Sequence, residues 1–314
     1  MCRLKKDDSE LVLGLLRMSS SKPLSGQIAL VTGGSRGIGR GIAVQLGEAG
    51  ATVYVTSRPP GKEEVIPENL RHLTIEAAAE EVTKRGGKGI VAYCDHSDPE
   101  QVKKLFEKID KEQNGRLDIL VNNAFAAVAA LSKDQKPFWE QDPSMFEFVN
   151  NVGLTNHYIC SVYASRLMVP RKKGLIVTIS SLAGGGYALN VAYSVGKGAC
   201  DRLASDMAHE LKNTGVISVA LWPGGAKTEL TMAVAEGALK KLVENGETTE
   251  FPGKAVVGLA TDPNLAKKNG MILTSPGLAK EYGFKDIDGG QPNQHFFDHL
   301  AKHIDNLNAA FAPK

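Results

Sequence analysis

The sequence has almost no net charge, no long apolar run and few cysteines. Its 37 Lys and Arg residues nearly balance its 35 Asp and Glu residues, so the formal net charge at pH 7 is +2. A charge excess this small does not favour nucleic acid or an anionic membrane as a partner. No apolar run approaches the ~18 residues that a membrane-spanning helix requires. The sequence therefore predicts neither a nucleic-acid-binding protein nor a transmembrane one.

The four cysteines are far apart and show no metal-ligand spacing. Because no secretory signal is recognisable, we expect reduced thiols, most of them in the core. His295 and His299 are spaced helically near the C-terminus, but a metal site requires a tighter constellation. We therefore predict no metal site, and we expect the tail after Pro292 to form an amphipathic surface or partner-binding helix.

Short apolar strands alternate with helical stretches along the chain. Continuous apolar strands suit a buried parallel sheet. The strand candidates are Ile28–Val31, Thr52–Thr56, Gly89–Cys94, Ile119–Val121, Leu175–Ser180, Ser218–Leu221 and Met271–Thr274. The clearest helical stretches are Leu73–Arg85, Glu100–Glu112 and Tyr193–Asn213. This pattern predicts an α/β fold with a single doubly wound, mostly parallel, Rossmann-like sheet and helices on both faces.

We divide the chain into three parts. Residues 1–25 form an N-terminal extension, which we expect to be a flexible tail or a short surface helix. Residues 26–275 form the sheet domain, and residues 276–314 form a C-terminal extension. Within the sheet domain, we expect residues 229–252 to form a helical substrate lid.

A glycine-rich turn, TGGSRGIG, follows the first strand candidate and opens a helical pattern. Glycines at 33, 37 and 39 let the backbone approach a pyrophosphate and let the helix pack close to the sheet. The N-terminus of the helix then binds the anion. The three glycines read GxxxGxG, one residue longer overall than the GxGxxG pattern, and they predict a dinucleotide site at this turn.

Tyr193 and Lys197 lie four residues apart, twelve residues after the pair Ser180-Ser181. On a helix this spacing places a phenol beside an ammonium. A neighbouring cation lowers the pKa of a phenol, whose ordinary value is about 10, so that it can exchange a proton at a carbonyl or carbinol. A YxxxK pair alone is a weak signal, and the alternative is a half-buried tyrosine beside a surface lysine.

Five motifs together resemble the short-chain dehydrogenase/reductase family in order and spacing: TGGSRGIG, NNA at 122–124, ISS at 179–181, YSVGK at 193–197 and WPGGAKT at 222–228. The resemblance covers residues 26 to 275, and stretches such as GRGIAVQL and NNVGL are similar to one branch of the family. It implies an oxidoreductase that moves a hydride between a nicotinamide cofactor and a ketone, aldehyde or secondary alcohol.

The resemblance also implies catalytic roles. Tyr193 would be the general acid in reduction and the base in oxidation, while Lys197 would lower the pKa of Tyr193 and hold the nicotinamide ribose. Ser181 would hold the substrate oxygen. The family uses the second serine of the pair, but its distance to the tyrosine is usually one residue longer than here, so Ser180 remains the alternative.

Charge at the end of the second strand indicates which cofactor is used. An acid there would bond the ribose hydroxyls of NAD, but the sequence reads Thr56-Ser57-Arg58. Arg58, together with Arg36 in the glycine turn, suits the 2′-phosphate of NADP(H). We therefore predict NADP(H) and keep NAD(H) as the alternative, in which Arg58 is a solvated turn residue and Arg36 caps the loop.

The remaining cofactor contacts are implied by the resemblance. Asp95 would meet the adenine amino group, unless it is only a turn residue before a helix, and Thr228 would bond the carboxamide. Phe125 stands where the family's NNAG motif has its glycine. The full predicted cofactor set is Gly33, Ser35, Arg36, Gly37, Ile38, Gly39, Arg58, Asp95, Asn122, Ala124, Tyr193, Lys197, Pro223, Gly224 and Thr228.

One family residue lacks a direct match. An asparagine in the fourth helix commonly holds a water in the proton relay, but an ungapped count puts Gly153 at that place, with Asn150 and Asn151 just before it. Either an irregular turn brings an asparagine back, or the relay lacks it. His157 and Tyr158, further along the same helix, are expected to serve packing or a subunit interface.

We thus predict an NADP(H)-dependent oxidoreductase acting on a small-molecule carbonyl or alcohol. The alternatives are an NAD-linked alcohol or steroid dehydrogenase and a catalytically idle NADP(H)-sensing or scaffold protein. By analogy with the family, we expect a homodimer or homotetramer. We expect a cytoplasmic protein, with peripheral attachment to the endoplasmic reticulum as the alternative.

Overall fold

A computed structural model describes residues 22–59, 61, 68–128, 131, 136–234, 243–292 and 294–312. Its centre is a sheet of seven parallel strands in the order β3-β2-β1-β4-β5-β6-β7. The strands are β1 Ile28–Val31, β2 Thr52–Ser57, β3 Lys88–Tyr93, β4 Ile119–Asn122, β5 Gly174–Ile179, β6 Val216–Trp222 and β7 Ile272–Thr274. The strand order reverses between β1 and β4, which pair with Ala29 opposite Ile119. A crevice forms at such a point, outside the carboxyl ends of the strands.

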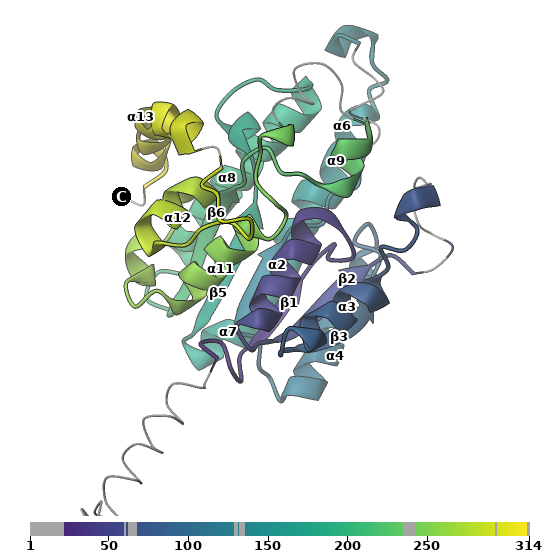
Figure 1. The fold of residues 1–314 in the computed structure, drawn as a ribbon, viewed down its shortest axis with the longest axis vertical. Coiled ribbons are helices and arrows are strands. Elements are labelled where there is room, and N and C mark those ends of the chain that lie inside the picture. Colours follow the sequence, from purple (N-terminus) through teal and green to yellow (C-terminus); the bar gives the residue numbers. More distant parts are fainter. Residues whose placement is uncertain are drawn as a thin grey trace, which may run out of the picture.

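Helices cover both faces of the sheet (Figure 1). The helices are α2 Gly37–Glu48, α3 Ile75–Lys84, α4 Pro99–Gln113, α6 Met145–Asn150, α7 Asn156–Met168, α8 Val191–Glu210, α9 Glu229–Val234, α11 Phe251–Thr261, α12 Ser275–Tyr282 and α13 Gln294–Phe311. In β1, Ala29 and Val31 pack with α2, α3, α11 and α12, whereas Ile28 and Leu30 pack with α4 and α7. This alternation follows from the two-residue period of a strand, and it confirms the predicted doubly wound fold.

Side chains set several helix boundaries that the sequence pattern placed one or two residues away. α8 begins at Val191 because the Asn190 side chain accepts a hydrogen bond from the amide of Tyr193 at 2.8 Å. α4 begins at Pro99 because Asp98 caps the amides of Glu100 and Gln101. Such N-caps satisfy amides that have no partner within the helix.

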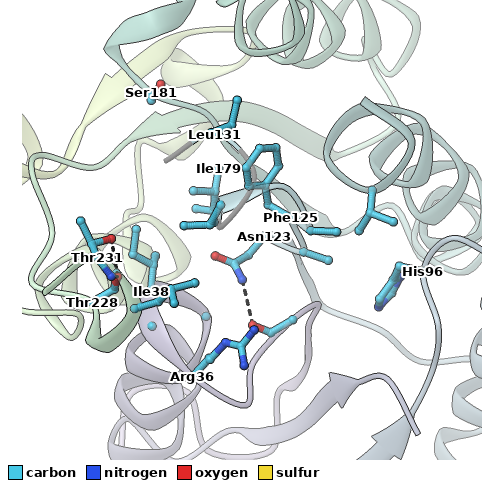
Figure 2. A pocket seen from close by; sticks show the side chains of 18 of the residues that line it. Arg36, Ile38, His96, Asn123, Phe125, Leu131, Ile179, Ser181, Thr228 and Thr231 are labelled. Carbon is cyan, nitrogen blue, oxygen red and sulfur yellow. Dashed lines mark hydrogen bonds between the residues drawn. The ribbon is translucent and has the colours of Figure 1, made fainter. Parts of the chain in front are cut away.

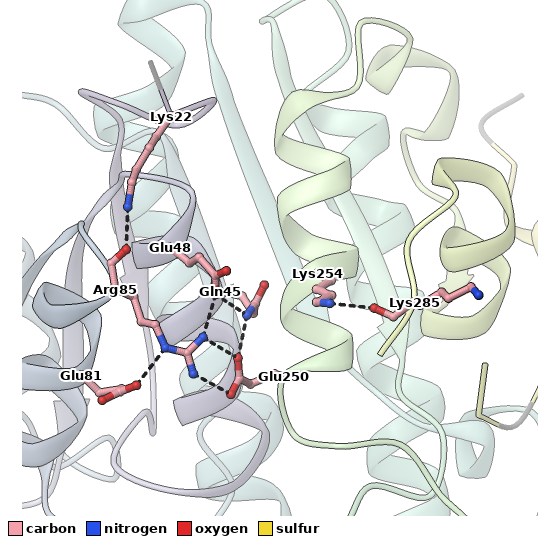
Figure 3. A network of polar contacts seen from close by, with 8 residues as sticks. All are labelled: Lys22, Gln45, Glu48, Glu81, Arg85, Glu250, Lys254 and Lys285. Atoms are coloured by element: carbon pink, nitrogen blue, oxygen red, sulfur yellow. Dashed lines mark hydrogen bonds and ion pairs between the residues drawn. The ribbon is translucent and has the colours of Figure 1, made fainter. Parts of the chain in front are cut away.

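Polar contacts on the surface tie α2, α3 and α11 together (Figure 3). Arg85 at the end of α3 pairs with Glu81 at 2.9 Å, with Glu48 of α2 at 2.8 Å and with Glu250 before α11 at 3.3 Å. Lys22 donates to the carbonyl of Arg85 at 2.5 Å. The ordered packing therefore includes Lys22, three residues before the expected end of the N-terminal extension at residue 25, whereas residues 1–21 lie outside the described residues.

The C-terminal helix α13 covers the outer edge of the sheet. Its Phe297 and Ile304 are buried in one cluster with Trp222 and Ile272. The Asn308 side chain accepts a hydrogen bond from the amide of Ile272 at 2.7 Å and donates to its carbonyl at 3.1 Å. This amide thus takes the place of a neighbouring strand at an otherwise open sheet edge, so the helix predicted after Pro292 is packed on β7.

Three of the four cysteines, Cys94, Cys160 and Cys200, are free and buried, as predicted. Burial raises the pKa of the Cys94 thiol to about 12 and that of Cys200 to about 11. Cys2 lies outside the described residues. In the part of the chain that the structure describes, no helix is long and apolar enough to cross a membrane.

Candidate active site

A cavity of about 890 Å³ opens at the carboxyl ends of the strands. Figure 2 shows side chains from both halves of the sheet converging on it. Of the predicted residues, the cavity is lined by Gly33, Ser35, Arg36, Gly37, Ile38, Gly39, Arg58, Asp95, Ala124, Ser180, Ser181, Tyr193, Lys197, Pro223, Gly224 and Thr228. The fold thus brings together residues that are spread over nearly two hundred positions of the sequence.

Asn122 is the exception among the predicted residues, because it does not line the cavity. It ends the buried strand β4, and its side-chain amide donates to the hydroxyl of Ser161 at 2.9 Å and to the carbonyl of His157 at 3.3 Å, both in α7. The next residue, Asn123, lines the cavity instead. The alternation of side chains along a strand explains why two adjacent asparagines face different surroundings.

The glycine turn leaves no room for side chains. Gly33 has a φ of +67°, and a Cβ there would lie 2.9 Å from Cα of Ala124. A Cβ on Gly39 would lie 2.3 Å from the carbonyl oxygen of Gly33. These close approaches bring the N-terminus of α2 against the end of β4, which is the arrangement that exposes backbone amides to an anion.

An acidic side chain already lies at this helix terminus. The amide of Gly37, the first residue of α2, donates to a carboxylate oxygen of Glu229 at 2.9 Å. Arg36 precedes the helix and makes no side-chain cap. The Glu229 carboxylate stands in for an oxyanion such as a phosphate oxygen, so the turn accepts the charge that a pyrophosphate carries.

Thr32 and Asn123 fasten the glycine turn to β4. The Thr32 hydroxyl accepts from the amides of Asn123 at 2.9 Å and Ala124 at 3.0 Å. The Asn123 side chain donates to the carbonyls of Thr32 at 2.9 Å and Gly33 at 3.1 Å. This network fixes the turn before any ligand binds, and the sequence motif alone did not reveal it.

His96 also supports the turn, although no sequence motif marks it as a site residue. Its Nε2 lies 2.7 Å from the hydroxyl of Thr56, which in turn accepts from the amide of Gly33 at 3.1 Å. Burial lowers the pKa of His96 to about 4, so the imidazole is neutral at pH 7. The ring itself therefore adds no charge to the cavity wall.

Two arginines and one acid, Arg36, Arg58 and Asp95, line the cavity. Asp95 accepts hydrogen bonds from the amide of Ser97 at 3.0 Å and from its hydroxyl at 2.7 Å. Asp95 is therefore a turn residue that also faces the cavity, so the two interpretations of its sequence position are compatible. The cap of the following helix is Asp98.

Tyr193, Lys197 and Ser181 form one group on the cavity lining. The Tyr193 hydroxyl lies 3.3 Å from the Ser181 hydroxyl, to which it donates. The Lys197 ammonium donates to the carbonyl of Ile179 at 3.0 Å, and the residue is only 8% exposed, so the surface-lysine interpretation is wrong. The other serine, Ser180, is buried and donates to the carbonyl of Lys197 at 3.0 Å, which leaves Ser181 as the serine beside the phenol.

The helix around Gly153 is irregular, which is the first of the two alternatives for the missing asparagine. A π turn spans Asn151–Thr155, and Val152 and Gly153 have non-helical backbone angles. The turn leaves Asn151 on the cavity wall. It leaves Asn150 buried against α8, where its side chain donates to the carbonyl of Ala192 at 3.2 Å.

Two buried titratable groups lie behind the catalytic candidates. Asp201, one turn after Lys197, accepts a hydrogen bond from the indole of Trp222 at 2.8 Å, and burial raises its pKa to about 7. His157 lies 3.2 Å from the carbonyl of Ala124, and burial, assisted by the nearby Lys197, lowers its pKa to about 3. The packing predicted for His157 is observed. Asp201 was missed, although it continues the four-residue spacing of Tyr193 and Lys197.

The expected lid is described in part. Helix α9 covers Glu229–Val234 at the cavity rim, where the Thr228 and Thr231 hydroxyls lie 2.6 Å apart (Figure 2). Residues 235–242 lie outside the described residues, so a continuous lid stays a prediction. Among the residues that the structure does describe, no group of three or more His, Cys, Asp or Glu side chains is arranged to hold a metal ion.

Known proteins are similar to this chain over most of its length. The short chain dehydrogenase family model matches residues 27–238. Dehydrogenase/reductase SDR family member 1 of Mus musculus is 50% identical over 286 residues, with 87% of each chain covered. The Homo sapiens protein of the same name is 47% identical over 307 residues, covering 93% of this chain and 94% of the relative. This is the branch that GRGIAVQL and NNVGL resemble.

Solved structures agree with the fold. A metagenomic short-chain oxidoreductase in complex with NADP is 28% identical, covers 77% of this chain and 93% of its own, and has a TM-score of 0.61. A putative gluconate dehydrogenase from Agrobacterium tumefaciens is 26% identical, covers 82% and 97%, and has a TM-score of 0.67. The glycine turn, the Tyr193–Lys197 pair and these similarities agree: the chain belongs to the short-chain dehydrogenase/reductase family of oxidoreductases.

Proposed function

We propose that the protein is an NADP(H)-dependent oxidoreductase that interconverts a carbonyl compound and its secondary or primary alcohol. The observation that carries the proposal is the placement of the Tyr193 hydroxyl 3.3 Å from the Ser181 hydroxyl, beside the buried Lys197, in the cavity that also contains the glycine turn. A bound nicotinamide supplies or takes the hydride. The protein's own residues must hold the reactants and move the proton.

Each residue of the group has a role that its position supports. The Tyr193 phenol donates its proton to the carbonyl oxygen during reduction and accepts one from the alcohol during oxidation. The Ser181 hydroxyl donates a hydrogen bond to the same oxygen and stabilises its developing charge. The Lys197 ammonium favours the phenolate by its charge and is placed to hold the ribose of the cofactor.

The cofactor fits the residues present. The glycine turn has space only for backbone at Gly33 and Gly39, and its helix terminus already accepts a carboxylate at Gly37. Arg36 and Arg58 line the same cavity and suit a 2′-phosphate, which an arginine binds with two parallel hydrogen bonds. These features support NADP(H) over NAD(H).

The activity is tested by NADPH oxidation with a panel of ketones and aldehydes, compared with Tyr193→Phe. We expect turnover by the unmodified protein and its loss in Tyr193→Phe with NADPH affinity nearly unchanged, because only the hydroxyl is removed. Tyr163→Phe, on α7 away from the cavity, is the matched control. Tight NADPH binding with no turnover of any carbonyl would support the idle sensor instead.

The cofactor preference is tested by Arg58→Ala. Because a charge-assisted hydrogen bond is worth about 1.5–3 kcal/mol, we expect NADPH affinity to fall roughly 10- to 150-fold while NADH affinity hardly changes. Arg71→Ala, which lies outside the cavity lining, controls for a general loss of positive charge. Equal affinities of the unmodified protein for NADH and NADPH would contradict the preference.

We also propose that the protein is a homodimer or larger homo-oligomer. Helices α7 and α8 expose large apolar side chains, of which Tyr158 is 57% and Val195 50% exposed. An apolar surface of this kind supports self-association. Sedimentation at micromolar concentration tests it: a species of about twice the chain mass or more is expected, and a single species at the chain mass of 33.5 kDa would contradict it.

A further inference from the structure

Phe125 contacts Lys197, Tyr193 and the irregular turn at Gly153. It follows β4 and lines the cavity. The centre of its ring is 5.1 Å from the Lys197 ammonium and 5.7 Å from the centre of the Tyr193 ring, to which it is edge-on at 65°. Figure 2 shows the ring among the residues at the centre of the cavity. No other aromatic ring among the described residues contacts both Tyr193 and Lys197.

The Lys197 ammonium needs such a neighbour. It is buried, and burying an ammonium is costly unless its environment compensates. Its hydrogen bond to the carbonyl of Ile179 uses one of three donors. Within the described parts of the chain, no carboxylate forms an ion pair with it. The face of an aromatic ring attracts a cation, more strongly where water is excluded.

The groups that titrate around this ammonium come from two helices. His157 of α7 stays neutral above pH 4, because burial lowers its pKa to about 3. Cys200 of α8 stays protonated at neutral pH, because burial raises its pKa to about 11. Asp201 of α8 ionises near pH 7. The carboxylate is thus the one neighbour among these three that changes charge between pH 5 and 9.

The irregular turn provides the space for the ring. A Cβ on Gly153 would lie 2.6 Å from Cδ2 and 3.0 Å from Cε2 of Phe125. The amide of Ala126 donates to the carbonyl of Val152 at 3.3 Å, so the loop after β4 is joined to the irregular turn next to the ring. A glycine at 153 and an aromatic residue at 125 therefore form a matched pair.

We propose that Phe125 is a positioning residue, whose ring sits in the space left by Gly153 and holds the Lys197 ammonium and the Tyr193 phenol at their working separation. The ring does not touch the proton that moves, and it acts through the two side chains that it contacts. This inference rests on the proposed function of Tyr193 and Lys197. It adds Phe125 to the site, at the position where the family's NNAG motif has a glycine, which has no ring for this role.

The first test compares Phe125→Leu with Phe125→Tyr. Leucine keeps an apolar side chain but removes the ring, whereas tyrosine keeps the ring. We expect Phe125→Leu to lower kcat about tenfold and to move the alkaline-rising limb of alcohol oxidation to higher pH by about half a unit or more, because the cation is less well held beside the phenol. Phe125→Tyr should stay within about threefold and keep the pH profile. Equal losses in both variants, or an unmoved profile in Phe125→Leu, would overturn the proposal.

Gly153→Ala provides an independent test of the matched pair. The added methyl must displace the ring, so this variant should reproduce the pH shift of Phe125→Leu. Gly153 has a φ of +157°, which strains any side chain there with or without the ring, so in the double variant the two pH shifts, rather than the two losses of stability, should not add. Additive effects would show that Gly153 acts apart from Phe125.

A structural measurement separates failure of this inference from failure of the proposed function. In a crystal structure of Phe125→Leu, or of Phe125→Met if the first variant does not fold, we expect the Lys197 ammonium to have left the carbonyl of Ile179. This outcome can be observed whether or not the unmodified protein reduces any carbonyl. An unmoved ammonium overturns the inference, while absence of turnover in the unmodified protein counts against the proposed function alone.

Discussion

The two ends of the cavity are held in place by different kinds of contact. At the cofactor end, the glycine turn of residues 32–39 is fixed by hydrogen bonds between backbone groups and the short side chains of Thr32 and Asn123. At the substrate end, Phe125 and the irregular turn around Gly153 are fixed by the fit of a ring against a backbone without a side chain. A hydrogen-bonded turn tolerates almost no added atom, whereas a packed ring can be exchanged for another of similar shape.

The largest effect is expected where the cofactor end has no spare space. In Gly39→Ala the added Cβ would lie 2.3 Å from the carbonyl oxygen of Gly33, which is backbone and has little freedom to move. We expect the affinity for NADPH to fall by about 100-fold or more, because the displacement breaks several hydrogen bonds. Equilibrium titration by nucleotide fluorescence measures it.

Gly186→Ala is the control for Gly39→Ala. A Cβ on Gly186 meets no atom within 4 Å, so its affinity for NADPH should not change. Retained affinity in Gly39→Ala would show that the turn is softer than its contacts indicate, and the contrast between the two ends of the cavity would be lost.

The second effect concerns the serine pair between the two ends. Ser181→Ala removes the hydroxyl beside the phenol, and loss of one oxyanion donor typically costs about 100- to 1,000-fold in kcat. Ser180→Ala removes a hydroxyl that donates to the carbonyl of Lys197, so we expect a loss of about tenfold or less. Steady-state kinetics of the two variants decide the order. If Ser180→Ala is the inactive variant, the predicted position of the serine is one residue too late.

Short-range sequence patterns predicted the backbone of the glycine turn. Gly33 and Gly39 are required by close backbone approaches, and glycine at a fixed spacing carries that information in the sequence itself. The four-residue spacing of Tyr193 and Lys197 likewise places both side chains on one face of a helix, so the sequence alone predicts that they are neighbours. Both patterns depend only on residues near each other in the chain.

Contacts between distant segments could not be predicted in this way. Asn122 and Asn123 look alike in the sequence, yet one bonds α7 and the other bonds the glycine turn. The ring of Phe125 meets Lys197, 72 positions later. His96 supports the turn through Thr56, although nothing in its own segment distinguishes it. These contacts exist only once the sheet order is known.

The third prediction concerns Asp201, which lies behind the serine loop on the same helix as Lys197. Burial raises its pKa to about 7, above the ordinary value near 4. Between these pH values the folded protein binds a proton that the unfolded chain has lost, so stability falls as pH rises from about 4 to 7. We expect Asp201→Asn to remove this fall, on the order of 1–3 kcal/mol. Urea unfolding at pH 5 and pH 8 measures it.

Asp206→Asn, which removes a carboxylate that is exposed on the same helix, is the control for Asp201→Asn. Its pH dependence should match that of the unmodified protein. If stability depends on pH in Asp201→Asn as it does in the unmodified protein, groups other than Trp222 stabilise the ionised carboxylate of Asp201.

The smallest effect is expected at a contact between α9 and the glycine turn. The Glu229 carboxylate, at the start of α9, accepts a hydrogen bond from the amide of Gly37 at the N-terminus of α2. A pyrophosphate bound at that terminus must displace the carboxylate and is repelled by its charge. Glu229→Gln keeps the shape and removes the charge, and a charge at a helix end is worth about 0.3–1 kcal/mol. We therefore expect NADPH to bind about two- to fivefold more tightly, most clearly at low salt.

Glu210→Gln removes the same charge from the end of α8 and should leave the affinity unchanged, so it separates a local effect from a change in net charge. Both variants are titrated with NADPH at low and high salt. Weaker binding in Glu229→Gln would mean that the carboxylate helps to hold the cofactor in place. In that case the hydrogen bond from Gly37 to Glu229 would stabilise the glycine turn rather than compete with the pyrophosphate.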